Sequence, residues 1–262
     1  MSVVLLDREV VHYESLGRGR PLLLLHSWVG SWRYWIPAMQ AACGSFRVYA
    51  LDLWGYGDSS KNIGLFSFES QVSLVERFLN EMGIARVAMV GHGLGAVLSE
   101  VFARAFPQRV DRLMHISFPY TPTGLVHLLS STSTQSLVDW LMDRESFETA
   151  VRVEAQKADP RARAFSARAV TQMDLDGMLK YAALPKLFVY GAKDALPPPP
   201  AGDQSDRLPE SSHLVIMEES GHYPMLQETS RFNRLLLDFI SLPPGESPRL
   251  LQLKEEWKRR VR

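Results

Sequence analysis

The chain has 262 residues, of which 46% are hydrophobic and 22% charged, and its formal net charge is +0. This length is enough to bury one large core, and the balanced charge favours neither nucleic acid nor an acidic membrane as a partner. The single cysteine, Cys43, allows no internal disulfide, and no cysteine–histidine spacing indicates zinc. We expect a small molecule as substrate or ligand, with no metal and no organic cofactor.

The N-terminus does not resemble a signal peptide, because Asp7 interrupts it and no long apolar core follows. No apolar run in the sequence approaches the length of a transmembrane helix. The sequence therefore predicts a cytoplasmic protein without an integral membrane segment.

Short apolar runs alternate with helical patterns along most of the chain. The runs predict strands at 3–6, 10–14, 22–25, 46–51, 86–90, 112–117, 186–190 and 213–217. Helical patterns cover about 32–42, 68–82, the stretch after 94, and 225–240. Strands joined by helical crossovers predict an α/β fold with a doubly wound, mostly parallel sheet of about eight strands.

This alternation stops between residues 118 and 183. Helix-like segments cover 125–129, 137–142, 147–158 and 162–173, without a convincing strand among them. We therefore predict a helical cap at 118–183, inserted into a core made of residues 1–117 and 184–243.

Residues 244–262 form a basic tail with apolar residues at helical spacing. These are Leu250, Leu253, Trp257 and Val261. Such a helix can lie on a membrane or on a partner, or it can pack on its own domain with the basic face in solvent. The packed arrangement is favoured, and contact with a partner or a membrane surface through the tail stays open.

The residues 91–95, here called the Gly93 turn, join a predicted strand to a predicted helix. The glycines Gly91, Gly93 and Gly95 allow a sharp bend there without Cβ clashes. The spacing also matches the dinucleotide fingerprint G-x-G-x-x-G/A, which needs an acidic residue at the end of the next strand. Asp111 has the right spacing but precedes that strand, so the fingerprint is disfavoured.

The Gly93 turn resembles the nucleophile elbow of α/β-hydrolases, G-x-S-x-G, except that Gly93 stands where the family has serine. Four further segments carry the resemblance. They are the His-Ser-Trp turn at 26–28, the D-x-x-G-x-G-x-S segment at 52–59, the strand and G-x-x-D at 189–194, and the Ser-Gly-His-Tyr-Pro loop at 220–224. In the second of these, we expect Asp52 and Asp58 to hold loops rather than to do chemistry.

The resemblance implies a role for each matched position. Asp194 corresponds to the catalytic acid and His222 to the catalytic histidine, in the chain order that this fold uses. The backbone N–H groups of Trp28 and Leu94 correspond to the oxyanion hole, and Ser27 replaces the usual glycine beside it. The remaining residues expected to line a pocket under the cap are Ser27, His92, Trp54, Phe118, Tyr120, Trp140 and Tyr223.

Three hypotheses follow. The first is hydrolysis of a small apolar ester or lactone by the His222–Asp194 dyad and the oxyanion hole, without a serine nucleophile at position 93. Ser27 and Ser117 are the nearest substitute nucleophiles, but neither lies on the elbow. The second is a catalytically inactive protein that binds a ligand in the emptied site. The third is an ordinary serine hydrolase whose nucleophile was changed to Gly93 by engineering.

Overall fold

An eight-stranded sheet with the order β1-β2-β4-β3-β5-β6-β7-β8 forms the centre of the molecule. The computed structural model describes residues 2–120, 122, 124–142, 148–180, 184–200 and 208–251, with the backbone alone for 148–150. The strands are β1 Ser2–Leu6, β2 Glu9–Leu16, β3 Arg20–Leu25, β4 Phe46–Leu51, β5 Val87–His92, β6 Val110–Ile116, β7 Lys186–Gly191 and β8 Ser212–Met217. Only the pairs β1–β2 and β2–β4 are antiparallel, so the predicted mostly parallel α/β sheet is confirmed.

The middle strands are covered on both faces, which explains their nearly continuous apolar sequences. Every residue of β5 is buried, as are the last four of β3. In the parallel register Leu25 pairs with both Leu51 and Gly91, so β3, β4 and β5 end at the same edge of the sheet. The loops that follow these strands therefore meet at that edge, together with those after β6, β7 and β8.

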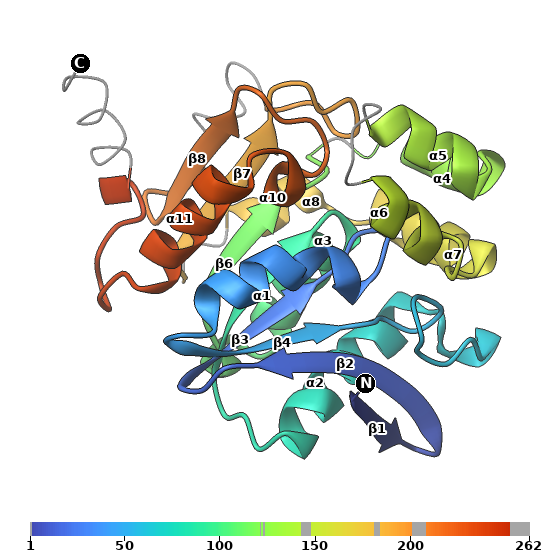
Figure 1. The fold of residues 1–262 in the computed structure, drawn as a ribbon, viewed down its shortest axis with the longest axis horizontal. Helices are drawn as coiled ribbons and strands as arrows, with labels where there is room; N and C mark the ends of the chain where they lie inside the picture. The colour runs from blue at the N-terminus through green and yellow to red at the C-terminus, as the bar shows by residue number, and fades with distance from the viewer. Residues whose placement is uncertain are drawn as a thin grey trace.

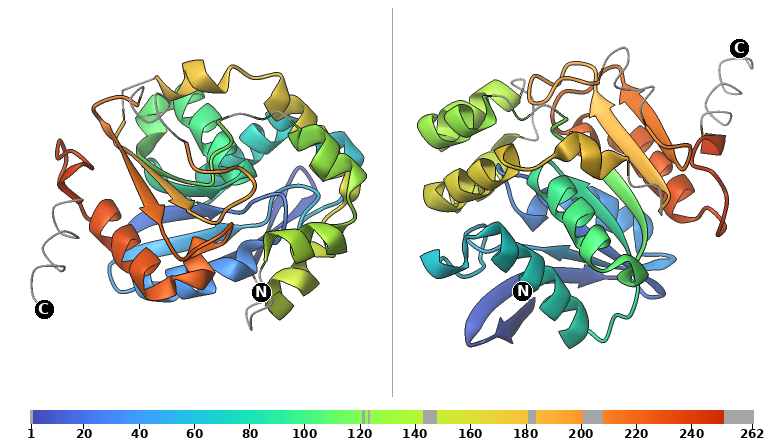
Figure 2. Two further views of the ribbon diagram at one scale, coloured as in Figure 1. Left: turned by 90° about the horizontal axis from the view of Figure 1, so that it is seen from above. Right: turned by 180° about the vertical axis from the view of Figure 1, so that it is seen from behind.

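Helices cover both faces of the sheet. They are η1 Trp32–Trp35, α1 Ile36–Ala42, η2 Ile63–Leu65, α2 Phe68–Glu81, α3 Leu94–Ala105, η3 Pro107–Arg109, α10 Pro224–Gln227 and α11 Thr229–Ile240. Figure 1 shows α1 and α11 on the near face, and the right view of Figure 2 shows α2 and α3 on the opposite face. Two predicted helices are divided: 32–42 begins as a 3-10 turn, and 225–240 is interrupted at Glu228.

Between β6 and β7 the described chain is helical, as the sequence predicts for this stretch. The helices are α4 Leu125–Ser131, α5 Thr134–Leu141, α6 Glu148–Ala155, α7 Pro160–Thr171 and α8 Leu175–Leu179. Helices α4 to α7 lie beyond the carboxyl ends of the strands (Figure 1). Two hydrogen bonds tie them to the loop after β3, one from Trp28 Nε1 to Ser166 Oγ (3.0 Å) and one from Ser31 Oγ to Glu154 Oε2 (2.9 Å). The division into a core and a separate cap domain stays a prediction.

At the C-terminus the described residues end with Leu251, which is buried beside the partly exposed Leu250. Most of the predicted basic tail 244–262, namely residues 252–262, lies outside the described part, so the contacts of the tail stay a prediction. Among the described helices, none has the length and apolar character that crossing a membrane requires.

Candidate active site

The Gly93 turn contains three glycines for two different reasons. β5 ends at His92 and α3 begins at Leu94, with Gly93 alone between them at φ 50° and ψ −106°, a conformation that side chains disfavour. Gly91 and Gly95 are needed for close packing instead. A Cβ on Gly91 would lie 2.2 Å from the Gly95 oxygen, and a Cβ on Gly95 would lie 2.4 Å from the Leu25 oxygen.

The loop after β3 packs directly against Gly93. A Cβ built on Gly93 would lie 2.2 Å from Ser27 Oγ and 3.3 Å from Trp28 Cε3. Non-bonded carbon and oxygen atoms do not approach to 2.2 Å, so the present position of the Ser27 hydroxyl excludes a side chain at residue 93.

His222 and Asp194 form a buried pair at the same edge of the sheet. His222 Nδ1 lies 3.1 Å from each carboxylate oxygen of Asp194. Oδ2 of Asp194 also accepts a hydrogen bond from the Ser117 hydroxyl (2.5 Å), and Oδ1 accepts one from the Leu196 N–H (2.8 Å). Ser117, which directly follows β6, has a φ of 49°, a value unusual outside glycine.

These contacts keep Asp194 ionised. Burial by itself raises the pKa of the Asp194 carboxyl, but the charge and hydrogen bond of His222, with the donors Ser117 and Leu196, hold that pKa below its usual value. The carboxylate accepts a hydrogen bond from His222 Nδ1, so the proton of the neutral imidazole is on Nδ1 and Nε2 is the unprotonated nitrogen.

His92 links this pair to the Gly93 turn. The rings of His92 and His222 lie 4.5 Å apart between centroids, and the Tyr223 ring is 5.0 Å from His222 and 5.3 Å from His92. Burial lowers the pKa of His92 well below its ordinary value, so this ring is neutral. The structure therefore brings four predicted site residues together, namely Gly93, His92, His222 and Asp194.

Two backbone N–H groups flank Gly93 without a hydrogen bond to the described part of the chain. They belong to Trp28 and Leu94. Their neighbours are paired, since the Ser27 N–H donates to the Tyr34 hydroxyl (2.7 Å) and the Gly95 N–H donates to the His26 carbonyl (3.1 Å). Two donors are thus available where the loop after β3 meets the start of α3.

The predicted aromatic pocket residues lie in different places. Tyr223 lies against the rings of His92 and His222, and Trp28 of the predicted oxyanion hole lies beside Gly93. Phe118 and Tyr120 instead pack against each other and against Phe188, with no ring contact to His222 among the described residues.

Trp54 and Trp140 belong to neither of these sets of contacts. Trp54 is buried, and Gln71 accepts a hydrogen bond from its backbone N–H (3.0 Å). Trp140 is 49% exposed on α5. Leu137, Val138 and Leu141 form the buried side of that helix, and a place for Trp140 in a pocket stays a prediction.

Sequence reasoning missed Tyr34. Its hydroxyl accepts a hydrogen bond from the Ser27 N–H and donates one to His92 Nδ1 (3.0 Å), so it joins the loop after β3 to the Gly93 turn. A tyrosine inside a helical pattern carries no motif, so no signal in the sequence distinguishes it from an ordinary core residue.

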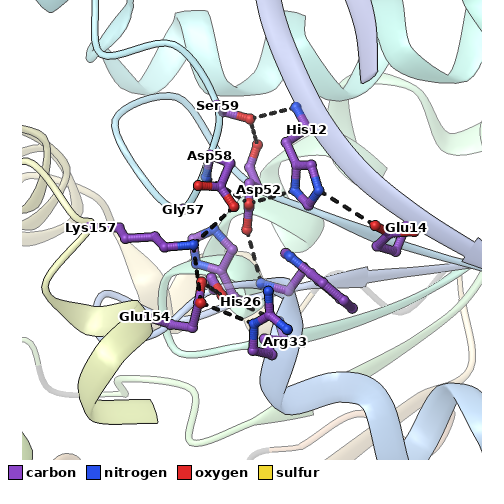
Figure 3. Close-up of polar contacts among 12 residues, drawn as sticks. His12, Glu14, His26, Arg33, Asp52, Gly57, Asp58, Ser59, Glu154 and Lys157 are labelled. Carbon is purple, nitrogen blue, oxygen red and sulfur yellow. Dashed lines mark hydrogen bonds and ion pairs between the residues drawn. The ribbon is translucent and has the colours of Figure 1, made fainter. Parts of the chain in front are cut away.

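A second histidine–aspartate pair lies elsewhere, between His12 Nδ1 and Asp52 Oδ2 at 2.8 Å (Figure 3). Asp52 also accepts hydrogen bonds from the N–H groups of Trp32 (2.9 Å) and Asp58 (3.0 Å), as expected for a residue that holds loops. Ligand atoms of His12, Asp52 and Asp58 lie within 4.8 Å of one another, a spacing that a metal ion could use. The hydrogen bonds at Asp52 already account for both of its oxygens, so we assign the cluster a structural role.

The dinucleotide interpretation of the Gly93 turn is excluded by the position of Asp111. This residue lies at the start of β6, where Val110 pairs with Val87, whereas the turn lies at the other end of β5. Asp111 instead contacts Arg112 (2.7 Å). A ribose bound at the turn is therefore out of its reach.

Comparison with known proteins places this arrangement in context. The family model described as "alpha/beta hydrolase fold" matches residues 20–175, which is more than half of the chain. The match includes the Gly93 turn and the loop after β3. It ends before Asp194 and His222, whose pairing rests on the geometry above.

Among similar proteins, bifunctional epoxide hydrolase 2 of Sus scrofa is 36% identical over 120 residues, covering 44% of this chain and 21% of that protein. The chain thus spans only about a fifth of that relative. A pimeloyl-[acyl-carrier protein] methyl ester esterase of Vibrio parahaemolyticus is 26% identical over 254 residues, covering 87% of this chain and 97% of the esterase.

Solved structures show the same fold. An enol-lactonase from Burkholderia xenovorans superposes with a TM-score of 0.80 at 18% identity, covering 92% of this chain and 100% of that one. An esterase from Exiguobacterium antarcticum also gives a TM-score of 0.80 at 18% identity, covering 92% and 98%. At this level of identity the likeness concerns the fold alone.

Proposed function

Because the chain belongs to the α/β-hydrolase-fold family, we propose that it hydrolyses a small, largely apolar ester or lactone. The observation that carries this proposal is the buried His222–Asp194 pair beside the Gly93 turn, at the edge of the sheet where the loops meet. The names of the similar proteins, an epoxide hydrolase and a methyl ester esterase, agree with hydrolytic chemistry.

In this proposal Gly93 occupies the position at which the family carries its serine nucleophile. The positive φ of Gly93 between a strand and a helix supports that correspondence. Without a side chain, residue 93 contributes no attacking group and no atom to acylate. The remaining site would still supply a base and a place for the oxyanion.

His222 is the proposed general base. Asp194 accepts from Nδ1, which leaves Nε2 to take a proton from the attacking group and to return it to the leaving oxygen. The N–H groups of Trp28 and Leu94 are the proposed oxyanion hole, since they flank Gly93 without partners among the described residues. In its simplest form the reaction uses water as the attacking group.

The proposed substrate class follows from the surroundings. Tyr223 is buried against the ring of the base, Trp28 is buried beside Gly93, and both carry large apolar rings. The helices beyond the carboxyl edge of the sheet contact Trp28 through Ser166 and would form the cap over the site. We therefore favour a substrate with an apolar acyl or alcohol group over a highly charged one.

Hydrolysis of p-nitrophenyl acetate and butyrate by the parent protein and by His222→Ala tests this function. We expect kcat/KM to fall by at least about 10²-fold in the variant, because the proposed general base is removed. His127→Ala is a matched control, because His127 lies on α4 outside the site. Equal activity in the His222→Ala and parent proteins would contradict the proposal.

Ligand binding without turnover is the second candidate, favoured by the missing side chain at residue 93. It predicts that the parent protein binds an apolar ester and does not hydrolyse it, and that His222→Ala leaves this affinity unchanged. An engineered origin of Gly93 fits less well, because the Ser27 hydroxyl would have to move to admit a serine Cβ 2.2 Å away.

A further inference from the structure

The two residues that depart from the family's motifs, Ser27 and Gly93, are in contact with each other. Ser27 stands where the turn after the third strand usually has glycine, and Gly93 stands where the elbow has serine. The Ser27 Oγ lies 2.2 Å, and its Cβ 3.1 Å, from the place that a Cβ on Gly93 would take. The hydroxyl of Ser27 thus fills the space that the Cβ of a side chain on residue 93 would occupy.

We propose that Ser27 is the nucleophile of this site, a serine moved from the elbow to the loop that faces it. This inference rests on the proposed hydrolase function and names the attacking atom, in place of water, for the first step of that reaction.

The backbone of Ser27 is held at both of its polar groups. Its N–H donates to the Tyr34 hydroxyl (2.7 Å), and its carbonyl accepts from His26 Nδ1 (2.7 Å). His26 Nε2 accepts in turn from the Leu53 N–H (3.0 Å), which requires a neutral ring. Burial lowers the pKa of His26, consistent with that neutral state. A nucleophile on this loop would therefore be rigidly placed, as one on an elbow is.

The neighbouring groups fit the same role. In the elbow arrangement, one oxyanion donor is the N–H of the residue that follows the nucleophile. Trp28 follows Ser27, and its N–H has no partner among the described residues, nor has that of Leu94 across the turn. His222 lies beside the turn, with its ring 4.5 Å from that of His92.

The reaction balances as an acyl transfer in two steps. Ser27 Oγ attacks the ester carbonyl carbon while its proton passes to His222 Nε2, and the N–H groups of Trp28 and Leu94 stabilise the oxyanion. The C–O bond to the leaving alcohol then breaks, and His222 protonates that alcohol. Water attacks the acyl–Ser27 ester, its proton passes to His222, and the acid leaves as the Ser27 O–H forms again. The net reaction is ester plus water to acid plus alcohol.

A fluorophosphonate probe, followed by peptide mapping of the parent protein, tests this assignment without any substitution. We expect stoichiometric label on Ser27, an initial burst of p-nitrophenol, and loss of both in Ser27→Ala. Turnover in Ser27→Ala should fall by at least about 10²-fold. Ser99→Ala is the control, because it also removes a fully buried serine hydroxyl and lies along α3, and it should keep the label.

The double variant Gly93→Ser/Ser27→Gly restores the arrangement of the family and should take the label on residue 93. Label on any other residue of the parent protein would overturn the inference. So would full turnover in Ser27→Ala with none in His222→Ala, because water would then be the attacking group and the proposed function would stand. Unlabelled protein that hydrolyses no ester would overturn both proposals.

Discussion

The described part of the chain holds two buried histidine–aspartate pairs, His12–Asp52 and His222–Asp194, and the difference between their surroundings bears on which of them is the candidate base. The distances are similar, 2.8 Å from His12 Nδ1 to Asp52 and 3.1 Å from His222 Nδ1 to Asp194. In each pair the pKa of the carboxyl is lowered: burial opposes this, and the histidine and backbone N–H donors outweigh it. Distance and ionisation therefore do not distinguish the two.

The surroundings of the second ring nitrogen, Nε2, distinguish the two pairs. His12 Nε2 lies 3.6 Å from Glu14 Oε1. Asp52 forms hydrogen bonds with residues of β2, η1 and the loop after β4 (Figure 3). The His222 ring instead lies against His92, the residue before Gly93, in the turn whose Leu94 N–H has no partner among the described residues. A histidine–aspartate pair becomes a candidate base only when its free nitrogen faces a place that a substrate can enter.

Asp194→Asn should give the largest effect on activity. An amide cannot stabilise the imidazolium and can favour the wrong tautomer, so ester turnover should fall by about 10²–10⁴-fold. Steady-state kinetics on p-nitrophenyl esters measure this. An Asn variant with nearly parental turnover would mean that this pair is as structural as His12–Asp52.

Asp52→Asn should affect stability instead. It leaves His12 and two backbone donors with a poorer acceptor, and breaking a buried pair costs about 3–5 kcal/mol of the free energy of unfolding. Urea denaturation measures the loss, and turnover per folded molecule should stay close to that of the parent. Lost turnover in a protein shown to be folded would contradict the division of roles.

We also expect the stability difference between the parent and Asp52→Asn to depend on pH. Because the folded-state pKa of Asp52 is lowered, its stabilising contribution is present above the unfolded value of about 3.9 and is lost as pH falls through the folded pKa. The stability difference between the parent and Asp52→Asn should therefore shrink as pH decreases below about 3.9. Denaturation curves between neutral pH and pH 3 test this, and a constant difference would exclude the charge of Asp52 as the cause.

Gly93→Ala tests the Gly93 turn, which lies beside His222 and not beside His12. The positive φ of residue 93 should cost about 1–3 kcal/mol with a side chain, and the contact with the Ser27 hydroxyl should add to this. In a Ser27→Gly background the loss should be smaller. A double-mutant cycle by urea denaturation measures the coupling, and strictly additive losses would show that the two residues do not compete for space.

Lys157→Met should give the smallest effect. Lys157 pairs with Asp58 (3.0 Å) and Glu154 (3.1 Å) at the edge of the Asp52 cluster, where about a third of the Lys157 and Asp58 side chains is exposed. Such pairs contribute about 0–1 kcal/mol. Thermal unfolding at low and high salt measures it. A loss larger than that of Gly93→Ala would mean that this contact is a major link between α6 and the core.

Local patterns in the sequence were enough for the sheet and for the edge at which the candidate site lies. The apolar run of β5 and the helical spacing after Leu94 predict a strand joined to a helix, and the glycines between them predict a sharp turn. The loops that carry Asp194 and His222 follow predicted parallel strands, whose carboxyl ends share one edge of the sheet. Each of these inferences depends on residues close together in the chain or on a general rule of sheet geometry.

Distances between remote segments could not be obtained in this way. That the Ser27 hydroxyl fills the space beside Gly93, that Tyr34 joins Ser27 to His92, and that Trp140 is half exposed all depend on how loops and helices pack. Periodicity fixes which face of an element is apolar, but it does not fix which loop meets which turn to within an ångström. At this site that last distance decides whether residue 93 has room for a side chain.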